Sequence, residues 1–186
     1  FHPWVFSGTI KKMEGKAFDG CIAEIYSNKD EYLGCGIYQD ATIAVRILEF
    51  PPERSCTFGP DFWAEKIQTA WKLRQTASLT NSADTNVYRL VHGEGDHLPG
   101  LIVDYYNGHV VMQIHSAGLF CYSESIAEGI KSVYGEKLKS IYNKSSETLP
   151  GQLRNSSNSS GYLFLESDTS ENQNSEESGL IKIREN

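Results

Sequence analysis

The amino-acid sequence predicts a mixed α+β chain made of a small β-barrel, a bridging helix, a strand-rich α/β unit with one helix, and a polar linker. Short strand-like segments separated by turn residues follow one another over residues 1–58, as in small barrels. Apolar residues recur at helical spacing over residues 59–80. Residues 145–179 hold ten serines and four asparagines, a composition that buries too little apolar surface to fold alone.

The barrel is expected to consist of short strands joined by turns. Gly34 and Gly36 fall inside its third strand and indicate a bulge or a close approach of two backbones. The chain has no initiator methionine and begins within a strand-like segment, so we expect the first strand of the barrel to be missing. Pro51-Pro52 ends the barrel. Its strands are expected at residues 4–10, 21–26, 32–38 and 43–48.

One helix is expected to connect the barrel to the α/β unit. It is expected to open at Pro60, with Asp61 as the N-cap, and to run to about residue 77. The α/β unit follows over residues 81–143, with a two-residue hairpin turn at Asn107-Gly108. Its strands are expected at residues 87–91, 101–103, 109–115 and 138–142, and its helix at 123–134. The linker is expected at residues 144–186, with a short strand at 162–165 and strand-like alternation at 180–183.

A glycine-rich turn over residues 93–104, GEGDHLPGLIVD, leads into the second strand of the α/β unit. Its glycines permit positive φ, and Pro99 fixes its own φ. Glu94 and Asp96 are residue types that bind metals, but calcium sites need about six or more oxygen ligands. We therefore favour carboxylates that accept hydrogen bonds within the turn, and predict no metal site. The residues assigned to this structural turn are Gly93, Glu94, Gly95, Asp96, Pro99, Gly100 and Asp104.

The cysteines show no CxxC spacing, which disfavours zinc. Disulfides stay open in principle, but free thiols in a reducing cytoplasm are favoured, because nothing in the sequence indicates secretion. No apolar run reaches the roughly 18 residues of a membrane-spanning helix, and no signal peptide is recognisable. The four cysteines are Cys21, Cys35, Cys56 and Cys121.

The net charge of −7 bears on possible partners. Residues 1–80 contain nine basic and ten acidic residues, whereas a stand-alone RNA-binding domain usually has a basic excess. The near balance predicts weak or shape-based RNA binding, or a partner domain that supplies most of the affinity.

Four segments carry a family resemblance. They are HPWVFSGTI (2–10), LGCGIYQDATIAVRIL (33–48), AWKLR (70–74) and GEGDHLPGLIVDYY (93–106), in that order along the chain. The first two resemble the PUA signatures, the third the following helix, and the fourth the central motif of the PUA-domain-containing, SAM-dependent 23S rRNA methyltransferases that make 5-methylcytosine.

This resemblance implies a PUA fold for the barrel and a cytoplasmic role in ribosomal RNA methylation. His97 stands where the family usually has glycine, and Tyr105 where it usually has arginine. The family adds a cysteine thiolate to cytosine and transfers a methyl group from S-adenosylmethionine. Its catalytic domain lies beyond the linker. We therefore expect this chain to lack catalytic and cofactor-binding residues, to be inactive alone, and to act together with the missing catalytic domain.

Two kinds of side chain are candidates for RNA contact. Lysine and arginine side chains on the barrel rim can bind phosphates, and aromatic rings can stack on unpaired bases. For Trp4 we favour a core or domain-interface position. The alternative function is a protein-interaction module, which an acidic barrel with an exposed apolar patch would favour; a homodimer is also open. The RNA-binding candidates are His2, Trp4, Lys11, Lys12, Lys16 and Arg46.

Overall fold

The computed structural model describes residues 2–52, 56–80, 82–151, 153–156, 158–166, 181 and 183–184. The first sheet contains β1 (Trp4–Phe6), β2 (Ile22–Tyr26), β3 (Tyr32–Tyr38) and β4 (Ile43–Glu49). The second contains β5 (Val87–His92), β6 (Leu101–Tyr106), β7 (His109–Ile114), β8 (Ser140–Lys144) and β9 (Ser160–Leu165). The helices are α1 (Pro60–Thr76), α2 (Ala117–Phe120) and α3 (Ser123–Tyr134), and the short 3-10 helices are η1 (Ser7–Thr9), η2 (Gly93–Asp96) and η3 (Gly135–Lys137).

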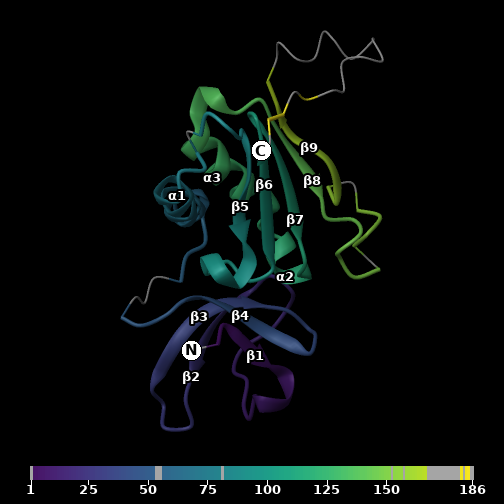
Figure 1. The fold of residues 1–186 in the computed structure, drawn as a ribbon. Helices are drawn as coiled ribbons and strands as arrows, with labels where there is room; N and C mark the ends of the chain where they lie inside the picture. The colour runs from purple at the N-terminus through teal and green to yellow at the C-terminus, as the bar shows by residue number, and fades with distance from the viewer. Residues whose placement is uncertain are drawn as a thin grey trace.

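The two sheets lie end to end, as Figure 1 shows. The first is antiparallel in the order β1-β4-β3-β2, and the second is mixed in the order β5-β6-β7-β8-β9. α1 and α3 lie on one face of the second sheet, and α2 lies at its junction with the first sheet. A single apolar core runs through both parts, so the sheets are packed together and not merely tethered. None of the described helices has the length and apolar character needed to cross a membrane.

The predicted barrel is wrong in one respect, because the described residues form an open four-stranded sheet. β1 pairs only with β4 and β2 pairs only with β3, so both are edge strands. The strand predicted at residues 4–10 ends at Phe6, where the 3-10 helix Ser7–Thr9 takes the backbone out of the ladder. A three-residue strand offers too few backbone groups to close the sheet.

The third strand has the predicted close approach of backbones. β3 has the predicted bounds, and its register with β4 shifts between Cys35 and Gly36. A Cβ atom at Gly36 would overlap the carbonyl oxygen of Arg46 on β4. Glycine is therefore required there for β3 and β4 to pair at all.

The bridging helix follows its prediction except at the cap. Gly59, and not Asp61, is the N-cap residue, because Pro60 occupies the first helical position and Asp61 lies within the first turn. Trp63 of α1 is fully buried against α3. A Cβ atom at Gly129 of α3 would lie 2.8 Å from the Trp63 Cβ, so glycine sets the close spacing of the two helices.

The second sheet, called the central sheet below, contains the predicted hairpin. Asn107 (φ 48°) and Gly108 (φ 95°) form the two-residue turn between β6 and β7. β8 begins at Ser140, two residues later than predicted, and runs parallel to β7 after the chain crosses through α2 and α3. His97, in place of the family's glycine, has a left-handed φ of 58°. Tyr105, in place of the family's arginine, stacks on Tyr88 and Tyr134.

The short strand predicted at residues 162–165 is present as β9 (Ser160–Leu165), but the described residues between 144 and 165 belong to the folded unit and not to an extended linker. Lys144 belongs to β8, Leu149 is buried, and β9 pairs antiparallel with β8 as an edge strand of the central sheet. The apolar residues of β9 gain burial from a sheet that already exists, which the segment could not supply alone. Residues 167–180 of the predicted linker lie outside the described residues, as does part of the predicted strand at 180–183.

Candidate nucleic-acid interface

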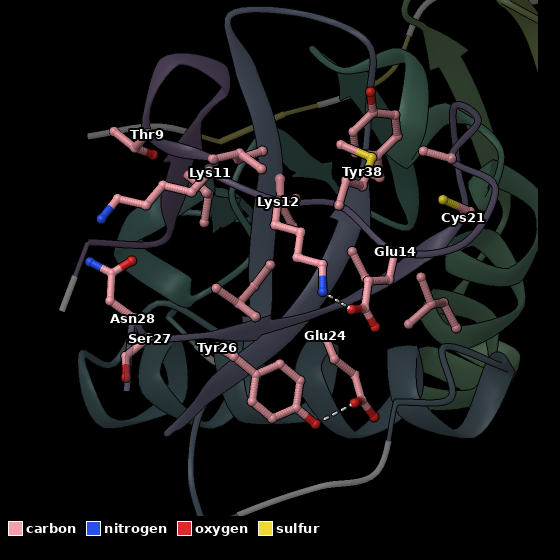
Figure 2. Close-up of a pocket in the computed structure, with 18 of the residues that line it drawn as sticks. Thr9, Lys11, Lys12, Glu14, Cys21, Glu24, Tyr26, Ser27, Asn28 and Tyr38 are labelled. Atoms are coloured by element: carbon pink, nitrogen blue, oxygen red, sulfur yellow. Dashed lines mark hydrogen bonds and ion pairs between the residues drawn. The ribbon is translucent and has the colours of Figure 1, made fainter. Parts of the chain in front are cut away.

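The first sheet carries a groove with a volume of about 640 Å³ (Figure 2). It lies between the irregular segment of residues 10–17 and the edge strand β2, and it also has lining residues on β3 and β4. Lys11, Lys12 and Lys16 all line it, as does the aromatic ring of Tyr26. The groove therefore brings together three of the six candidates for RNA contact.

The charges in this groove are balanced. Three carboxylates, those of Glu14, Glu24 and Asp30, also line it. Lys12 Nζ lies 2.5 Å from Glu14 Oε1, and both side chains are largely exposed. Lys11 and Lys16 have no ion-pair partner among the residues that the structure describes. These two lysines are consequently the cations best placed to meet a phosphate.

Arg46 does not join the lysines. Its neighbour on β4, Val45, lines the groove, and successive side chains of a strand point to opposite faces. Arg46 Nη1 donates to Gln39 Oε1 at 3.3 Å. A Cβ at Gly100 of the glycine-rich turn at residues 93–104, called the central turn below, would lie 3.3 Å from Arg46 Nε. Burial lowers the pKa of Arg46, and the negative charge of Glu94 opposes that effect. Arg46 therefore lies between the two sheets, and the four candidate cations Lys11, Lys12, Lys16 and Arg46 do not share one surface.

Trp4 and His2 also lie away from the groove, at the junction of the sheets. Trp4 is partly buried, and its indole N–H donates to Glu94 Oε1 of the central turn at 2.9 Å. The His2 ring meets the Trp4 ring edge-on, with centroids 4.9 Å apart. Trp4 is thus the domain-interface aromatic that we favoured, and its bond to Glu94 joins residues 90 positions apart.

Sequence reasoning missed the apolar character of the groove. Met13, Ile22 and Tyr26 all line it, and all three are exposed large apolar side chains. Alternate residues of β2 are exposed, so Ile22, Glu24 and Tyr26 share one face of the strand. That alternation was visible in the sequence, and it could have indicated Tyr26 as a surface aromatic.

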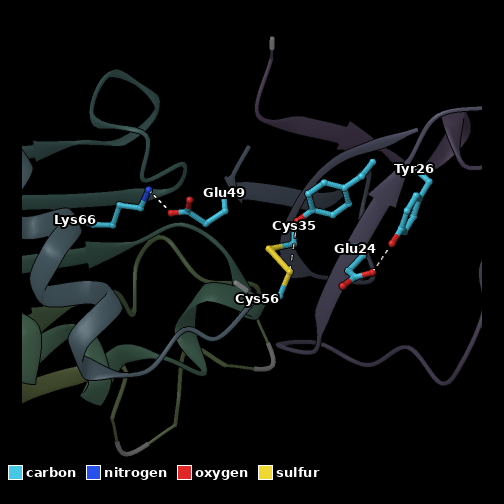
Figure 3. The surroundings of a disulfide bond; sticks show 7 residues. Glu24, Tyr26, Cys35, Glu49, Cys56 and Lys66 are labelled. Carbon is cyan, nitrogen blue, oxygen red and sulfur yellow. Dashed lines mark hydrogen bonds and ion pairs between the residues drawn. A yellow bond between two sulfur atoms is a disulfide. The ribbon is translucent and has the colours of Figure 1, made fainter. Parts of the chain in front are cut away.

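Cys35 and Cys56 form a disulfide, with Cα atoms 6.1 Å apart (Figure 3). The prediction of free thiols is wrong for this pair, because the segment ahead of α1 returns to β3 and brings the two residues together. Cys21 and Cys121 are free. Burial, and then the charge of Asp19, raise the pKa of the Cys121 thiol, which disfavours a reactive thiolate.

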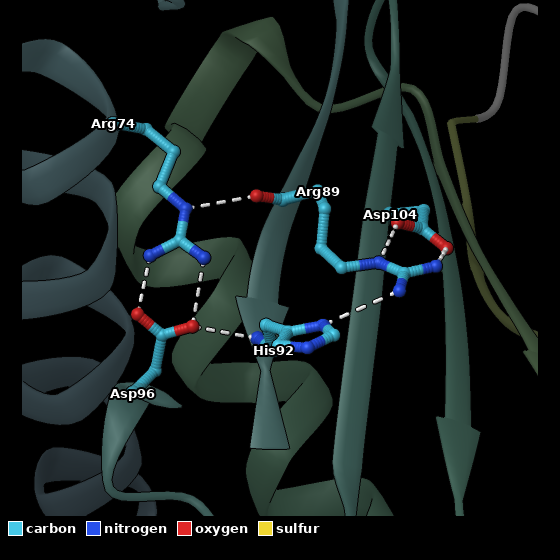
Figure 4. A network of polar contacts seen from close by, with 5 residues as sticks. All are labelled: Arg74, Arg89, His92, Asp96 and Asp104. Atoms are coloured by element: carbon cyan, nitrogen blue, oxygen red, sulfur yellow. Dashed lines mark hydrogen bonds and ion pairs between the residues drawn. The ribbon is translucent and has the colours of Figure 1, made fainter. Parts of the chain in front are cut away.

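The central turn is held by two arginine–carboxylate pairs, shown in Figure 4. Arg74 of α1 donates to both carboxylate oxygens of Asp96, and its Nε donates to the Arg89 carbonyl at 2.8 Å. Arg89 donates to both oxygens of Asp104 across the β5–β6 pair, at 2.8 and 3.2 Å. The backbone N–H of His92 adds a third bond to Asp96, at 2.6 Å.

Two carboxylates of the turn, those of Asp96 and Glu94, are engaged by residues of α1 and β1. The Asp96 carboxylate is occupied by Arg74 and His92, and Glu94 accepts the Trp4 indole N–H. Within the described ranges, no group of three or more His, Cys, Asp or Glu side chains has an arrangement that could hold a metal ion. Gly93 (φ 52°) and Gly100 (φ 86°) take the positive φ that the turn requires.

The chain is similar in sequence to a known domain family and to known methyltransferases. A PUA-like domain model matches residues 1–50. Ribosomal RNA large subunit methyltransferase I from Shigella boydii serotype 18 and from Escherichia coli K12 are each 34% identical to the chain over 145 residues, 77% of the chain. The chain spans only 35% of the length of these relatives.

Two solved structures share the fold. A candidate SAM-dependent methyltransferase from Streptococcus mutans has a TM-score of 0.68 at 18% identity, over 88% of this chain and 39% of its own. A candidate methyltransferase complexed with SAH has a TM-score of 0.67 at 17% identity, over 89% of this chain and 39% of its own.

Proposed function

The chain begins with a PUA-like domain and is homologous to the N-terminal portion of ribosomal RNA large subunit methyltransferase I, and we propose that it is the RNA-binding, substrate-positioning portion of such an enzyme. The observation that carries this proposal is the match over 145 residues, which covers 77% of the chain. The groove of the first sheet supports it, because cations and an exposed aromatic ring are the groups that bind nucleic acids. A ribosomal RNA substrate would place the protein in the cytoplasm.

The chemistry is assigned to a partner catalytic domain. The described residues do not fit S-adenosylmethionine, because the glycine-rich turn leads into strand β6 and not into a helix N-terminus that could face a cofactor. The carboxylates of the turn, which could otherwise accept ribose hydroxyls, are occupied by Trp4 and Arg74. We therefore propose methyl transfer from S-adenosylmethionine for the whole enzyme, and RNA positioning for this chain.

We expect this chain alone to show no saturable heat with S-adenosylmethionine in isothermal titration calorimetry, and no methyl transfer to ribosomal RNA. The reason is the absence of a suitable cofactor turn from the part of the chain that the structure describes. A matched titration of the SAH-binding solved relative with SAH provides the positive control. Saturable micromolar binding of S-adenosylmethionine to this chain would contradict the proposal that a separate catalytic domain binds the cofactor.

RNA binding is expected to weaken with salt and to depend on Lys11 and Lys16. Each phosphate contact to a single strand contributes a slope of about −0.7 in log Kobs against log salt. If each lysine contacts one phosphate, the slope of log Kobs against log salt should be less negative by about 1.4 for the Lys11→Ala/Lys16→Ala variant. Fluorescence anisotropy with a labelled RNA fragment, repeated over a salt series, measures this slope.

The control for this experiment is Lys72→Ala/Lys137→Ala, which changes the net charge equally at two exposed lysines away from the groove. This variant should keep the original slope. Equal slopes for the groove variant and the original chain would exclude the groove as the phosphate site. Failure of the chain to bind any RNA would contradict the proposed function itself.

A protein-interaction module is the second candidate function. The observation that favours it is the charge balance of the groove, together with its exposed Met13, Ile22 and Tyr26. Under this alternative the chain would bind a protein partner with little dependence on salt, whereas binding through phosphates depends strongly on salt.

A further inference from the structure

Tyr26 is the exposed aromatic residue of the groove. It lies at the end of the edge strand β2, and 53% of its surface is accessible. The hydroxyl of an exposed tyrosine can hydrogen-bond to water, but the apolar faces of its ring gain free energy when a ligand removes them from water. About half of the Tyr26 surface therefore faces solvent, on the side of the groove where a ligand could contact it.

Two of the contacts of this ring restrict its orientation. The Tyr26 hydroxyl donates to Glu24 Oε2 at 2.7 Å, and Figure 2 shows the two side chains beside each other. The Tyr32 ring meets the Tyr26 ring at an interplanar angle of 65°, with centroids 5.6 Å apart. A ring held in place loses less conformational entropy when a ligand covers it, so the surface is partly preorganised.

The charges around Tyr26 limit what phosphate contacts can supply. Lys12 is paired with Glu14, and the groove as a whole carries as many carboxylates as lysines. Lys11 and Lys16 can meet only a small number of phosphates. Stacking must consequently contribute a large share of the affinity of any nucleic acid that binds here.

We propose that this groove binds a single-stranded stretch of RNA, with one base stacked on Tyr26 and the adjoining phosphates on Lys11 and Lys16. This inference rests on the proposed function and specifies its substrate as unpaired RNA. In a duplex the faces of the bases are covered by their neighbours, so a fixed tyrosine ring has no base face to contact. An unpaired base offers its face to any aromatic ring, whatever its sequence.

The test uses the whole chain and a fluorescein-labelled RNA of about 12 nucleotides without self-complementarity, compared with the same RNA annealed to its complement. Anisotropy should show tighter binding to the single strand than to the duplex. Tyr26→Leu should weaken single-strand binding on the order of ten-fold, because it removes the ring and keeps apolar bulk. Tyr26→Phe, which keeps the ring, should retain most of the affinity.

The matched control is Tyr162→Leu. Tyr162 is another exposed strand tyrosine, 59% accessible, but it lies on β9 at the edge of the central sheet. This variant should bind the single strand as the original chain does. Circular dichroism of each variant verifies that the fold is intact.

The outcomes separate the inference from the function on which it rests. Preference for the duplex, or equal affinity of Tyr26→Leu and the original chain, would overturn the stacking site while leaving RNA binding in place. No binding to either RNA would overturn the proposed function. A concentration-dependent dimer in sedimentation that Tyr26→Leu abolishes, with RNA affinity unchanged, would identify the groove as a contact between two copies of the chain.

Discussion

Replacing Arg74 by methionine is expected to destabilise the chain by about 3–5 kcal/mol, because it leaves the buried carboxylate of Asp96 without its charge partner. The side chains of Arg74 and Asp96 are only 12% and 3% exposed. Methionine keeps much of the apolar stem, so the loss reports the guanidinium and not the packing. Denaturant unfolding followed by circular dichroism should show a lower midpoint with an unchanged slope.

The network itself provides the control. Arg89 forms the same two-oxygen pair with Asp104, but those side chains are 47% and 19% exposed, so water screens the interaction. Arg89→Met should therefore cost no more than about 1 kcal/mol. Adding Asp96→Leu to Arg74→Met should recover part of the lost stability, because the isolated buried charge is removed. Equal destabilisation by Arg74→Met and Arg89→Met would contradict the burial argument.

The glycine-rich turn was predictable as a turn, but its partners were not. Glycine and proline spacing depends on local backbone geometry, which the sequence displays directly. Asp96 is bound by an arginine 22 positions away, and Glu94 by a tryptophan 90 positions away. Such pairs depend on how α1 and β1 are packed, so the sequence indicated carboxylates without indicating what they bind.

The same distinction holds for the secondary structure. The hairpin turn Asn107-Gly108 and the helix Ser123–Tyr134 depend on local propensity and periodicity, and both were predicted correctly. A short strand was predicted at residues 162–165, but its pairing with β8 was not, because the serine-rich flanks made the rest of the segment resemble a linker. The disulfide also depends on tertiary packing, since Cys56 reaches Cys35 only after the chain returns to β3.

The candidate residues for RNA contact fall on two different faces of the first sheet for a geometric reason. Lys11, Lys12 and Lys16 follow β1 along one irregular segment, so their grouping could be predicted from the sequence. Arg46 lies next to Val45 on the same strand, but on the opposite face. Strand alternation predicts that Arg46 and Val45 lie on opposite faces of β4. The sequence did not show which of these faces forms the groove, because that depends on how residues 10–17 cross the sheet.

Replacing Trp63 by alanine is expected to destabilise the chain by about 3–5 kcal/mol, the range found for large aromatic side chains removed from cores. Trp63 is fully buried among Phe58, Phe62 and Tyr122, and its indole N–H donates to the Phe58 carbonyl at 2.9 Å. The close contact between α1 and Gly129 of α3 leaves the backbones little freedom to collapse into the cavity. Urea unfolding monitored by circular dichroism measures the loss.

Trp4→Ala is the matched control, because it removes the same side chain from a partly exposed position. It loses the bond to Glu94 and only part of the apolar burial, so we expect a cost of about 1–2 kcal/mol. A domain with a free energy of unfolding of about 5–15 kcal/mol tolerates the loss from Trp4→Ala far better than the loss from Trp63→Ala. Equal losses for Trp63→Ala and Trp4→Ala would mean that the junction of the sheets, and not the α1–α3 contact, dominates the stability of the chain.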